Sequence, residues 1–557
     1  MLPTSLVRPA ETERPARRVV VRLDPRRIWR WQVWLLESLS RAGTGEVAVA
    51  FGPGRPLPAA LRLLLSLERQ VYRLHGEQAA DLLDPRDVRA AWADPSADPP
   101  DLVIDLTGGE ADGSCIRPLY GGLAGDDALI GALLGDAPVR LRIAGSARRS
   151  GADLLPAVES RTVLTRCLNR VFSTVLSLCL AEAQRPSCDF RSIAPDDPGG
   201  IAAIAEPSRR DAEIGLAGVR GASGSAARAD DADFGTHRPR PVSGPRSGDV
   251  AASRAGGSGP VAVGAFLARA VASKLADRLT RLCTTAPRWR VGWRPLSTEA
   301  DDTGHTGRIP AGGYALLPDD GGRYYADPFI LTGAGRRFLF VEEYGYASSK
   351  GLISVAEIDG DGRIGTPRPV IEEPHHLSYP FVFTHAGAHY MIPESAACRR
   401  VELYRAARLP DRWERVAILL DDIAAADVTL TRTDGTWWMF ACTHPWQSSV
   451  RDTLSLFSAP DLFGPWTPHP QNPVVVDLRA ARPGGALFRK GGRLWRPAQD
   501  GSDGYGSALS LCRVDRLTPT EYRQSLETIL RPGGPWARDG LHTLNRGGGI
   551  EVVDGLF

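Results

Sequence analysis

Residues 324–346, YYADPFILTGAGRRFLFVEEYGY, decide the fold of the larger part of this chain. They contain an apolar strand pattern, a glycine turn at 333–335 and a second apolar strand, which together indicate a β-hairpin. The same unit recurs four times further along the sequence, each time opening with one or two characteristic residues. The five openings are Ala326-Asp327, Ser378-Tyr379, Ala426-Asp427, Ala481-Arg482 and Leu541-His542.

The spacing of the openings indicates how large one repeat is. Successive openings lie 52, 48, 55 and 60 residues apart. Four short strands with their turns need about this length, which is the size of one blade of a β-propeller. Apolar runs at 352–358, 401–406 and 453–458 supply a third strand in three copies. The repeat predicts an all-β five-bladed propeller over residues 288–557, in preference to a β-sandwich or two small barrels.

The first part of the sequence has a different pattern, in which strands and helices alternate. Apolar runs at 18–23, 46–51 and 101–106 are typical of strands, and residues 159–183 have helical spacing. This predicts an α/β domain over 18–187 with a parallel sheet. Residues 1–17 and 188–259 have few groups that could form a core, and predict a disordered N-terminus and linker. Residues 260–287 predict a connecting helix that docks on the propeller.

The composition excludes several classes of protein. The chain has 67 Lys and Arg against 65 Asp and Glu, so its net charge gives no electrostatic case for nucleic acid or an anionic membrane. Its eight cysteines form no CxxC pair and no zinc-like cluster, which is typical of reduced thiols in a cytosol. Residues 1–17 lack the apolar core of a signal peptide, and no apolar run is long enough to cross a bilayer. We expect a cytoplasmic protein.

A resemblance to a known family rests on motifs that occur in order within 289–557. They are YYADPFI, FVEEYGY, HLSYPFVF, YMIPES, VELYRA, FGPWTPHPQNPVV, ARPGG and RPAQD. These motifs resemble the N-terminal propeller of plant glucosamine inositolphosphorylceramide transferases and their bacterial relatives. That domain is similar to the five-bladed furanosidase-type glycoside hydrolases of families 43, 32 and 117. In the plant enzyme a glycosyltransferase domain follows the propeller, and we expect no such activity from this sequence, which stops at Phe557.

A propeller brings the openings of its innermost strands to one central site. The residues predicted to meet there are Asp327, Tyr379, Asp427, Arg482 and His542. The ends of the second strands add Glu342, Glu343, Glu394, Gln499 and Asp500. Sugar hydrolysis needs a carboxylic acid that protonates the leaving oxygen and a carboxylate that activates water or attacks the anomeric carbon, so this set predicts a carbohydrate site.

The resemblance implies roles for several of these residues. Asp327, in Ala-Asp-Pro, is similar to the catalytic first-blade motif of family 43 and is the predicted base or nucleophile. Glu394 or Asp427 is the predicted general acid. Guanidinium groups suit a substrate carboxylate, phosphate or hydroxyl pair. The predicted substrate-binding residues are Tyr379, Arg482, Arg496, Gln499, Asp500, Glu343 and His542. Trp438, Trp446, Tyr344 and Tyr346 are predicted to stack on sugar rings.

The sequence departs from the hydrolase pattern at two openings. Those families usually place an acid at the start of the second blade, where this chain has Tyr379, and often a glutamate at the third, where it has Asp427. His542 matches a histidine that in family 43 often lies near an axial cation. A structural Ca²⁺ or Na⁺ ion near His542 is therefore left open, and no other metal or cofactor is predicted.

The α/β domain has a resemblance of its own. Its placement and its closing helix, ESRTVLTRCLNRVF, look similar to folate-dependent formyltransferases. Those enzymes use an Asn-x-His and a distant Asp, and residues 18–187 contain no Asn-x-His. We expect a degenerate formyltransferase-like scaffold.

Three functions are compatible with these observations. The first is a carbohydrate-active enzyme that acts on a glycoside or sugar-phosphate conjugate by carboxylate acid/base catalysis at the propeller centre. The second is a non-catalytic propeller that binds a glycan or glycolipid headgroup and presents it to a partner glycosyltransferase. The third is formyl or acyl transfer by the α/β domain.

Overall fold

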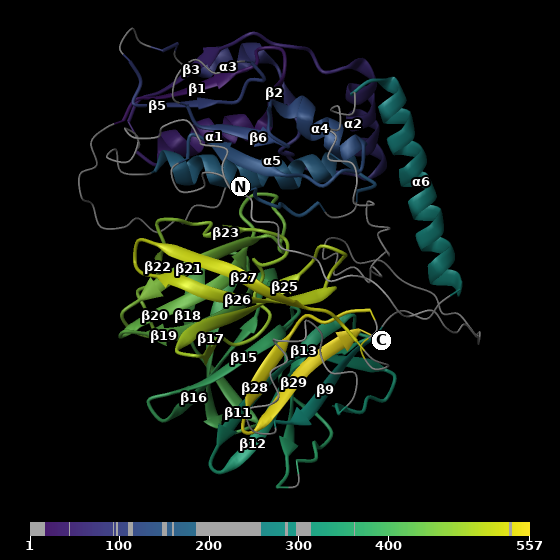
Figure 1. Ribbon diagram of the computed structural model, residues 1–557, viewed down its shortest axis with the longest axis vertical. Helices are drawn as coiled ribbons and strands as arrows, with labels where there is room; N and C mark the ends of the chain where they lie inside the picture. The colour runs from purple at the N-terminus through teal and green to yellow at the C-terminus, as the bar shows by residue number, and fades with distance from the viewer. Residues whose placement is uncertain are drawn as a thin grey trace.

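The computed structural model describes residues 17–43, 45–92, 94–95, 99–109, 115–146, 153–158, 161–184, 258–283, 288–296, 313–360, 362–533, 537 and 539–556. They form an α/β region, which helix α6 (Pro260–Cys283) joins, and an all-β region from 288 onward (Figure 1). The predicted disordered segments lie outside the described residues, apart from Arg17 and residues 258–259.

A parallel sheet lies within the α/β region. Its strands are β1 (Val19–Leu23), β3 (Val47–Phe51) and β5 (Leu102–Asp105), in the order β3-β1-β5. Val19 is in register with Val47 on one side and Leu102 on the other. Runs rich in Val, Ile and Leu suit strands that are covered on both faces. The predicted alternation of parallel strands and helices is confirmed, and the likeness to formyltransferases stays a prediction.

Helices and short strands complete the α/β region. The helices are α1 (Arg30–Arg41), α2 (Ala59–Val71), α3 (Pro85–Ala91), α4 (Asp126–Leu134) and α5 (Leu164–Ala183). The short strands are the pair β2 (Ile28–Trp29) and β4 (Leu82–Leu83), and the sheet of β6 (Arg117–Tyr120), β7 (Leu123–Ala124) and β8 (Leu141–Ala144). Helix α5 is buried on several faces because α1, α2 and α4 pack around it.

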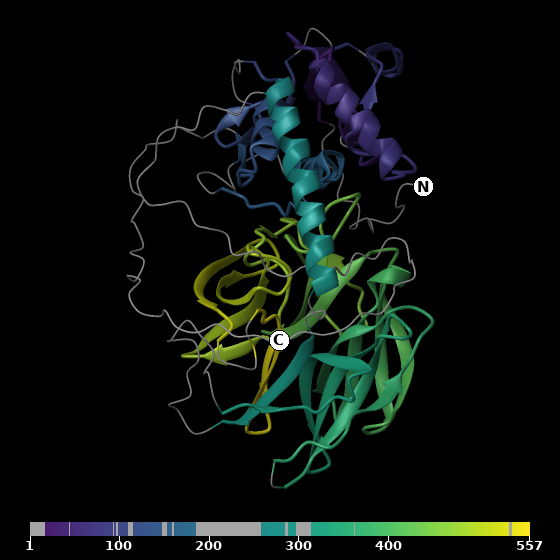
Figure 2. The ribbon, with the colours of Figure 1, turned by 90° about the vertical axis from the view of Figure 1, so that its right-hand side faces the viewer.

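Helix α6 corrects one expectation. It was predicted to dock on the propeller, but its residues Val263 and Phe266 belong to the core of the α/β region, where it packs against α2 and α4. Its buried positions, Val263, Phe266 and Ala270, follow one stripe of the helix, and the core that covers this stripe is that of the α/β region. The helix runs along one side of the α/β region (Figure 2). Among the described residues, no helix is long and apolar enough to span a membrane.

The described residues from 288 onward form five antiparallel sheets. The first contains β11 (Arg323–Gly333), β12 (Arg336–Gly345), β13 (Lys350–Ile358) and β14 (Arg368–Ile371). The second contains β15 (Ser378–His385), β16 (Ala388–Glu394), β17 (Arg400–Arg408) and β18 (Arg412–Asp421), with the 3-10 turn η2 (Ala396–Cys398). The third contains β19 (Ala425–Thr433), β20 (Thr436–Thr443), β21 (Thr453–Ala459), β22 (Thr467–Pro468) and β23 (Val475–Val476).

The last two sheets complete the region and join its two ends. The fourth contains β24 (Phe488–Lys490), β25 (Arg493–Asp500), β26 (Ala508–Leu517) and β27 (Tyr522–Leu530). The fifth has the order β10-β9-β29-β28, and contains β9 (Trp289–Pro295), β10 (Ala315–Leu316), β28 (Leu544–Gly547) and β29 (Ile550–Leu556). The early strand β9 therefore pairs with the late strand β29 in one sheet. The predicted all-β character of this region is confirmed.

Hydrogen bonds tie each sheet to the next through the opening of its first strand. The Tyr379 amide donates to Asp327, and the Tyr379 hydroxyl lies 3.0 Å from that of Thr429. Arg482 of the fourth sheet's opening donates to Asp427 of the third. The Leu544 amide donates to the Gly484 carbonyl, and the Asn545 side chain donates to the carbonyl of Pro328. The fifth sheet is therefore bonded to both the fourth and the first, and the openings of all five gather at one centre.

The first three openings share one backbone distortion. Asp327, Tyr379 and Asp427 have φ values of 50°, 42° and 54°. Each lies at a register shift of its first strand, where the chain bulges away from its partner. A positive φ costs an L-residue about 1–2 kcal/mol, and a bulge re-aims a side chain out of the regular alternation. The bulges turn these three side chains toward the centre.

The two regions meet at the loop between β20 and β21. Trp446 stacks on Trp34 of α1, with ring centroids 5.4 Å apart. The Gln447 side chain accepts from the Ala79 amide and donates to the Glu77 carbonyl. The carboxylate of Asp452 accepts from the amide of Ala157 at 2.7 Å. The α/β region thus supports a loop of the third sheet.

Candidate functional site

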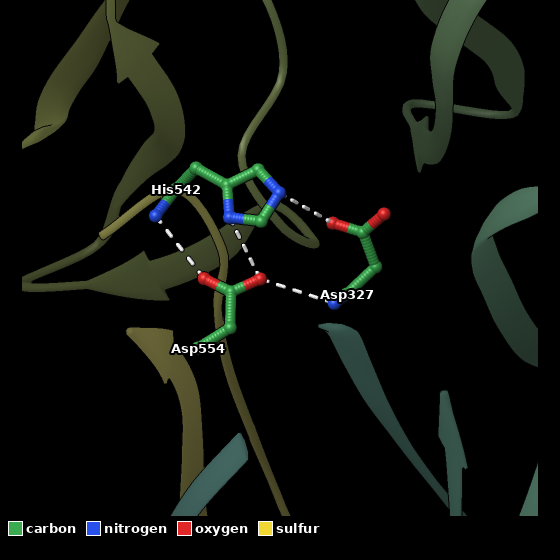
Figure 3. A group of neighbouring side chains, drawn as sticks. All are labelled: Asp327, His542 and Asp554. Atoms are coloured by element: carbon green, nitrogen blue, oxygen red, sulfur yellow. Dashed lines mark hydrogen bonds and ion pairs between the residues drawn. The ribbon is translucent and has the colours of Figure 1, made fainter. Parts of the chain in front are cut away.

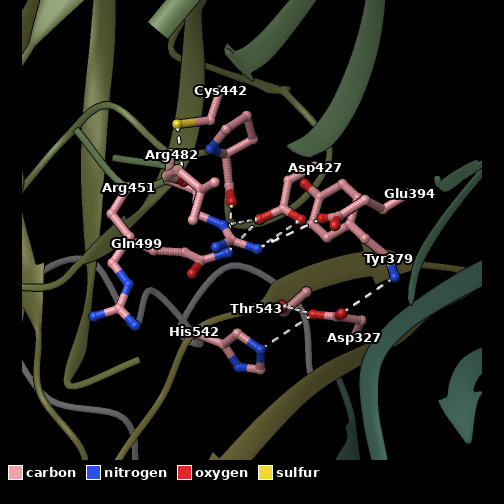
Figure 4. A network of polar contacts seen from close by, with 12 residues as sticks. Asp327, Tyr379, Glu394, Asp427, Cys442, Arg451, Arg482, Gln499, His542 and Thr543 are labelled. Carbon is pink, nitrogen blue, oxygen red and sulfur yellow. Dashed lines mark hydrogen bonds and ion pairs between the residues drawn. The ribbon is translucent and has the colours of Figure 1, made fainter. Parts of the chain in front are cut away.

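Five carboxyl groups lie buried where the sheets meet, and Figure 4 shows three of them, Asp327, Glu394 and Asp427. Asp327, Glu342, Glu394, Asp427 and Asp554 are between 0 % and 6 % exposed. We call them, together with Arg482 and His542, the acid cluster. Two cationic groups among five acids leave the cluster with more acids than cations to pair them, and a buried unpaired charge is costly unless the group is protonated.

Asp327 is held by three donors. Its carboxylate accepts from the Tyr379 amide at 3.1 Å and from the Thr543 hydroxyl at 2.8 Å, and its Oδ1 lies 3.3 Å from His542 Nε2. Burial raises the pKa of Asp327 to about 6, although the nearby His542 works in the opposite direction. Asp327 therefore loses its proton below neutral pH and is a carboxylate at pH 7, the form that a general base or nucleophile needs.

His542 lies between two carboxylates (Figure 3). Its Nδ1 is 2.8 Å from Asp554 Oδ2, on the side opposite Asp327. Burial alone would lower the pKa of His542, but Asp554 and Asp327 outweigh it and raise the pKa. Asp554 also accepts from the backbone amides of Asp327, His542 and Thr543. It fixes the histidine and the first opening in one geometry.

These three residues also have the donor atoms of a cation site. Their ligand atoms lie within 4.8 Å of one another. Carboxylate oxygens suit Ca²⁺, but an imidazolium that bridges two carboxylates already supplies the positive charge. A structural Ca²⁺ or Na⁺ at this point stays a prediction.

Glu394 and Asp427 form the second part of the cluster. Arg482 Nε lies 2.6 Å from Asp427 Oδ2, and its Nη2 lies 3.6 Å from Glu394 Oε2. Gln499 donates to the same Asp427 oxygen at 2.6 Å. Burial, and then the charge of Asp427, raise the pKa of Glu394 well above its usual range. The raised pKa favours the protonated form of Glu394, which lies beside the Asp427 carboxyl group to which Arg482 donates.

Glu342 is a second acid of this kind, at the end of β12. It lies 3.4 Å from His376 Nε2. Burial, followed by the charges of Asp327 and Glu394, raises the pKa of Glu342 well above its usual range. Burial lowers the pKa of His376 to about 4, so this histidine is neutral near pH 7 and does not offset the carboxyl group.

The structure does not bring the predicted Glu343 into the cluster. Its carboxylate accepts from the Ser354 hydroxyl at 2.6 Å and pairs with Arg323 on the other face of the sheet. Successive residues of a strand point to opposite faces. The neighbouring Glu342, also predicted at the centre, does lie in the cluster. It pairs with Ala326 as Glu394 pairs with Ser378, at equivalent positions of two openings. Cys442 pairs with Ala426 at the third.

Two predicted residues of β25 also lie apart from the cluster. Arg496, fully buried, donates to the carbonyls of Ala480 and Ala481. Asp500 accepts from the amide and hydroxyl of Ser502 and closes a turn. The alternation of the strand places Gln499 on the face toward the cluster and these two on the other.

Some of the predicted aromatic residues lie near the acid cluster and others lie away from it. Tyr344 lies beside His376, with ring centroids 6.1 Å apart, and stacks on Tyr324 at 5.0 Å. Trp438 is 2 % exposed within its own sheet, and Trp446 contacts the α/β region. Neither tryptophan lies at the cluster. Tyr379 bridges two sheets, since its hydroxyl accepts from the Gly485 amide at 2.8 Å.

Tyr505 is a site residue that the sequence did not reveal. The guanidinium groups of Arg482 and Arg451 lie 5.4 Å and 5.0 Å from the centre of its ring, and His542 lies 5.5 Å away. Tyr505 is half-buried and covers the cations of the acid cluster. It lies in the irregular segment between β25 and β26, outside the repeated unit, so no periodic signal marked it.

The α/β region has a smaller recess beside the end of β5. It is lined by Trp29, Trp31, Gln32, Leu106, Thr107, Pro118, Tyr120, Gly125, Asp126 and Phe172. Its acid, Asp126, is already bonded to Arg27 and to the Trp29 indole. The neighbouring Asp105 accepts from Arg117 and Thr107. These acids are matched by donors, which makes the acid cluster the stronger candidate for a functional site.

Fold and site together define a class: an all-β region whose sheets meet at a centre rich in carboxylates. Residues 319–531 match the family model described as "Glucosamine inositolphosphorylceramide transferase 1, N-terminal". This confirms the resemblance for that part of the chain. The match spans β11 to β27 and contains Asp327, Glu394, Asp427 and Arg482, whereas His542 and Asp554 lie beyond it.

Curated relatives carry the same name. Glucosamine inositolphosphorylceramide transferase 1 of Oryza sativa subsp. japonica is 31% identical over 282 residues, which cover 47% of this chain and 38% of the relative. The protein of that name from Arabidopsis thaliana is 30% identical over 246 residues, which cover 42% of this chain and 32% of the relative. The chain thus spans well under half the length of the curated relatives it matches.

Solved structures with some likeness are glycoside hydrolases. An exo-beta-1,3-galactanase from Clostridium thermocellum has a TM-score of 0.32 at 11% identity, covering 43% of this chain and 60% of that one. A family 117 glycoside hydrolase produced by Zobellia galactanivorans has a TM-score of 0.30 at 13% identity, covering 48% of this chain and 90% of that one. At such scores the description of the fold rests on the five sheets themselves.

Proposed function

We propose that the five sheets are the blades of a five-bladed propeller, and that the acid cluster is a carbohydrate-active site acting on a glycoside or sugar-phosphate conjugate. The observation that carries this proposal is the unequal state of neighbouring acids. Glu394 holds a proton because burial and Asp427 raise its pKa, while Asp327 loses its proton near pH 6. A site with one acid and one base is what glycoside cleavage requires.

In the proposed reaction, Glu394 gives its proton to the leaving oxygen as the glycosidic bond breaks. Asp327 either takes a proton from the attacking water or attacks the anomeric carbon itself. The distance between the carboxyl groups of Asp327 and Glu394 sets which of these occurs. His542 stabilises the Asp327 carboxylate and is positioned by Asp554. Asp427 and Arg482 act on Glu394 as positioning residues.

Substrate binding is assigned to the groups that face the cluster. Arg482 and Gln499 have donors for hydroxyl or phosphate oxygens, and Tyr505 offers a ring for stacking. The acids are almost fully buried, so Tyr505 and the half-buried Arg451 above it are the groups that a sugar would displace. A cytoplasmic location and a biosynthetic or modifying role complete the proposal.

The test is a panel assay on the full chain, using nitrophenyl furanosides, nitrophenyl glucosaminides and glycosylated inositol phosphates. Asp327→Asn and Glu394→Gln should each lower kcat by at least 100-fold on a substrate the native chain cleaves, the usual contribution of a general acid or base. Glu343→Gln is the matched control, because it changes a buried glutamate that faces away from the cluster, and should leave kcat unchanged. Equal turnover by all three variants would remove the acid cluster from the chemistry.

Chemical rescue separates a catalytic role from a structural one. On a nitrophenyl glycoside, azide should restore turnover to Asp327→Ala by attacking the anomeric carbon from the space of the missing carboxylate. It should also restore turnover to Glu394→Ala, because nitrophenolate leaves without a proton and azide then replaces the unactivated water, giving a glycosyl azide. A variant that has merely lost its fold gains nothing from azide. Rescue of neither variant, while both remain folded by circular dichroism, would contradict the roles assigned to these residues.

A second candidate is a non-catalytic propeller that binds a glycan or glycolipid headgroup for a partner glycosyltransferase. It is favoured by one observation: both oxygens of Asp327 already accept hydrogen bonds within the chain. Calorimetry with inositol phosphates and methyl glycosides distinguishes the two functions. Binding without release of product from any glycoside would favour the second.

A further inference from the structure

Helix α6 exposes an apolar surface over half of its circumference. Its exposed residues include Val261 at 87%, Leu267 at 43%, Val271 at 57%, Leu275 at 57% and Leu279 at 60%. At 3.6 residues per turn Val261, Leu275 and Leu279 fall on the side opposite the buried stripe of Val263, Phe266 and Ala270, and Leu267 and Val271 lie on the flank between. Small residues on the same exposed side of the helix extend this apolar sector, namely Gly264, Ala265, Ala268, Ala272 and Ala276. The surface runs about 27 Å along the helix.

Basic residues flank this sector on both sides. On the helical wheel Arg269 lies at one edge, and Lys274 and Arg278 lie at the other. All three are exposed. The only acid of α6 is the half-buried Asp277, on the packed side of the helix. The chain as a whole is nearly balanced, with 67 basic against 65 acidic residues, so this concentration of positive charge is local.

The neighbouring helix α2 extends the same surface. It packs against α6, and the two helices lie on the side of the molecule that faces the viewer in Figure 2. Its residues Leu63, Leu67 and Val71 are 61%, 47% and 69% exposed, one turn apart. Exposed Arg62 accompanies them, and Arg69 is paired with Asp81 and bonded to the Gly76 carbonyl. The acid of α2, Glu68, is buried against the start of α5. Lys274 of α6 covers the ring of Tyr72, which follows α2.

We infer that this α2/α6 surface docks on an anionic lipid surface. Helices that lie in a membrane interface have a wide apolar face bordered by Lys and Arg, whose stems cover apolar atoms while their charges reach the headgroups. Anionic lipid phosphates supply the negative charge that the helices lack. A second copy of the chain is a poorer occupant, since a symmetric contact would bring the same cations together with no exposed acid of α6 to pair them.

The experiment uses the full chain and vesicles of phosphatidylcholine, with or without phosphatidylserine, separated by centrifugation. We expect the native chain to sediment with the anionic vesicles at least ten times more than with the neutral ones, and to be released by salt. Val271→Glu combined with Leu275→Glu should lower this binding at least tenfold, because it places two charges in the middle of the apolar face.

Two further variants make the test specific. Val416→Glu with Ile418→Glu is the matched control, as these residues of β18 are 43% and 44% exposed in the all-β region, and it should bind like the native chain. Arg278→Glu should weaken binding to anionic vesicles without adding a charge to the apolar face. The inference is overturned if the native chain stays in solution with both vesicles, or if the α6 variants bind unchanged. It is also overturned if light scattering shows a native dimer that the α6 double variant converts to a monomer.

Discussion

The two regions of this protein treat buried acids in opposite ways. In the α/β region each buried acid described above has its own donors: Asp105 has Arg117 and Thr107, and Glu68 has the first amides of α5. At the centre of the all-β region five acids share Arg482 and His542. Stability alone favours the first arrangement. A surplus of buried carboxyl groups that stay protonated is therefore the mark of a site rather than of a scaffold.

The largest expected difference concerns the two buried arginines. Arg482→Met leaves the Asp427 carboxyl with the Gln499 amide as its one side-chain donor among the described residues, and should lower the free energy of unfolding of the all-β region by about 3–5 kcal/mol. Arg117→Met is the matched change in the α/β region. Asp105 keeps two bonds from Thr107 there, so we expect a loss of only about 1–3 kcal/mol.

The two variants are compared by urea unfolding monitored by hydrogen exchange, because exchange reports the strands of each region separately. Equal losses for Arg482→Met and Arg117→Met would show that the acid cluster is no more dependent on its cations than an ordinary ion pair.

The second prediction concerns pH. Burial raises the pKa of Asp327 from 3.8 to about 6. The folded all-β region therefore binds this proton more tightly than the unfolded chain, and the stability it contributes below about pH 4 is lost as the pH rises through 6. Asp327→Asn should flatten the decline by about 1–3 kcal/mol across this interval. The measurement is the free energy of unfolding of β11 and β15 between pH 4 and 7, in the native chain and in Asp327→Asn. The same dependence on pH in both proteins would contradict the raised pKa of Asp327.

The third prediction is that neutralising a buried acid stabilises the all-β region and destabilises the α/β region. Glu342→Gln replaces a carboxyl whose ionisation is disfavoured at the cluster, and should raise the free energy of unfolding near pH 8 by about 1 kcal/mol. Asp105→Asn removes the partner of Arg117 and should lower it by about 2–4 kcal/mol. Destabilisation by both changes, measured by urea titration, would mean that Glu342 is as well matched as Asp105.

The smallest expected effect lies at the contact between the regions. Gln447→Ala removes two hydrogen bonds to the α/β region, at Ala79 and Glu77, and should weaken the coupling by about 1 kcal/mol. In calorimetry the two unfolding transitions should then move apart. Gln471→Ala is the control, because its side chain accepts from Tyr522 within the all-β region, and it should lower one transition without separating the two.

Much of the fold could be predicted because its signals are local. The strands β1, β3 and β5 follow apolar runs, and the openings Ala326-Asp327 and Ala426-Asp427 repeat a short pattern. The docking of α6 could not be predicted, because either of two apolar cores could have covered its buried stripe. An amphipathic pattern says which face is buried, and not what covers it.

The candidate site was predictable where it follows the repeat. Asp327, Asp427 and Arg482 meet because each opens a sheet. Both Glu342 and Glu343 were predicted at the centre, and only Glu342 lies there, because strand alternation separates two neighbouring residues only once the register of the partner strand is known. Asp554 was missed, although it lies on the second strand of the fifth unit and accepts from the amides of His542 and Thr543 at its opening. Its strand β29 also pairs with β9, more than 250 residues earlier in the sequence.

That pairing has a consequence for how the protein is made. Asp554 and His542 come from the last strands of the all-β region, whereas Asp327 comes from its first sheet. During synthesis the first four sheets leave the ribosome before β28 and β29 do. Until those strands emerge, β9 has no partner in β29 and Asp327 has neither His542 nor Asp554 beside it. A chain released early would keep most of its sheets and have no complete acid cluster.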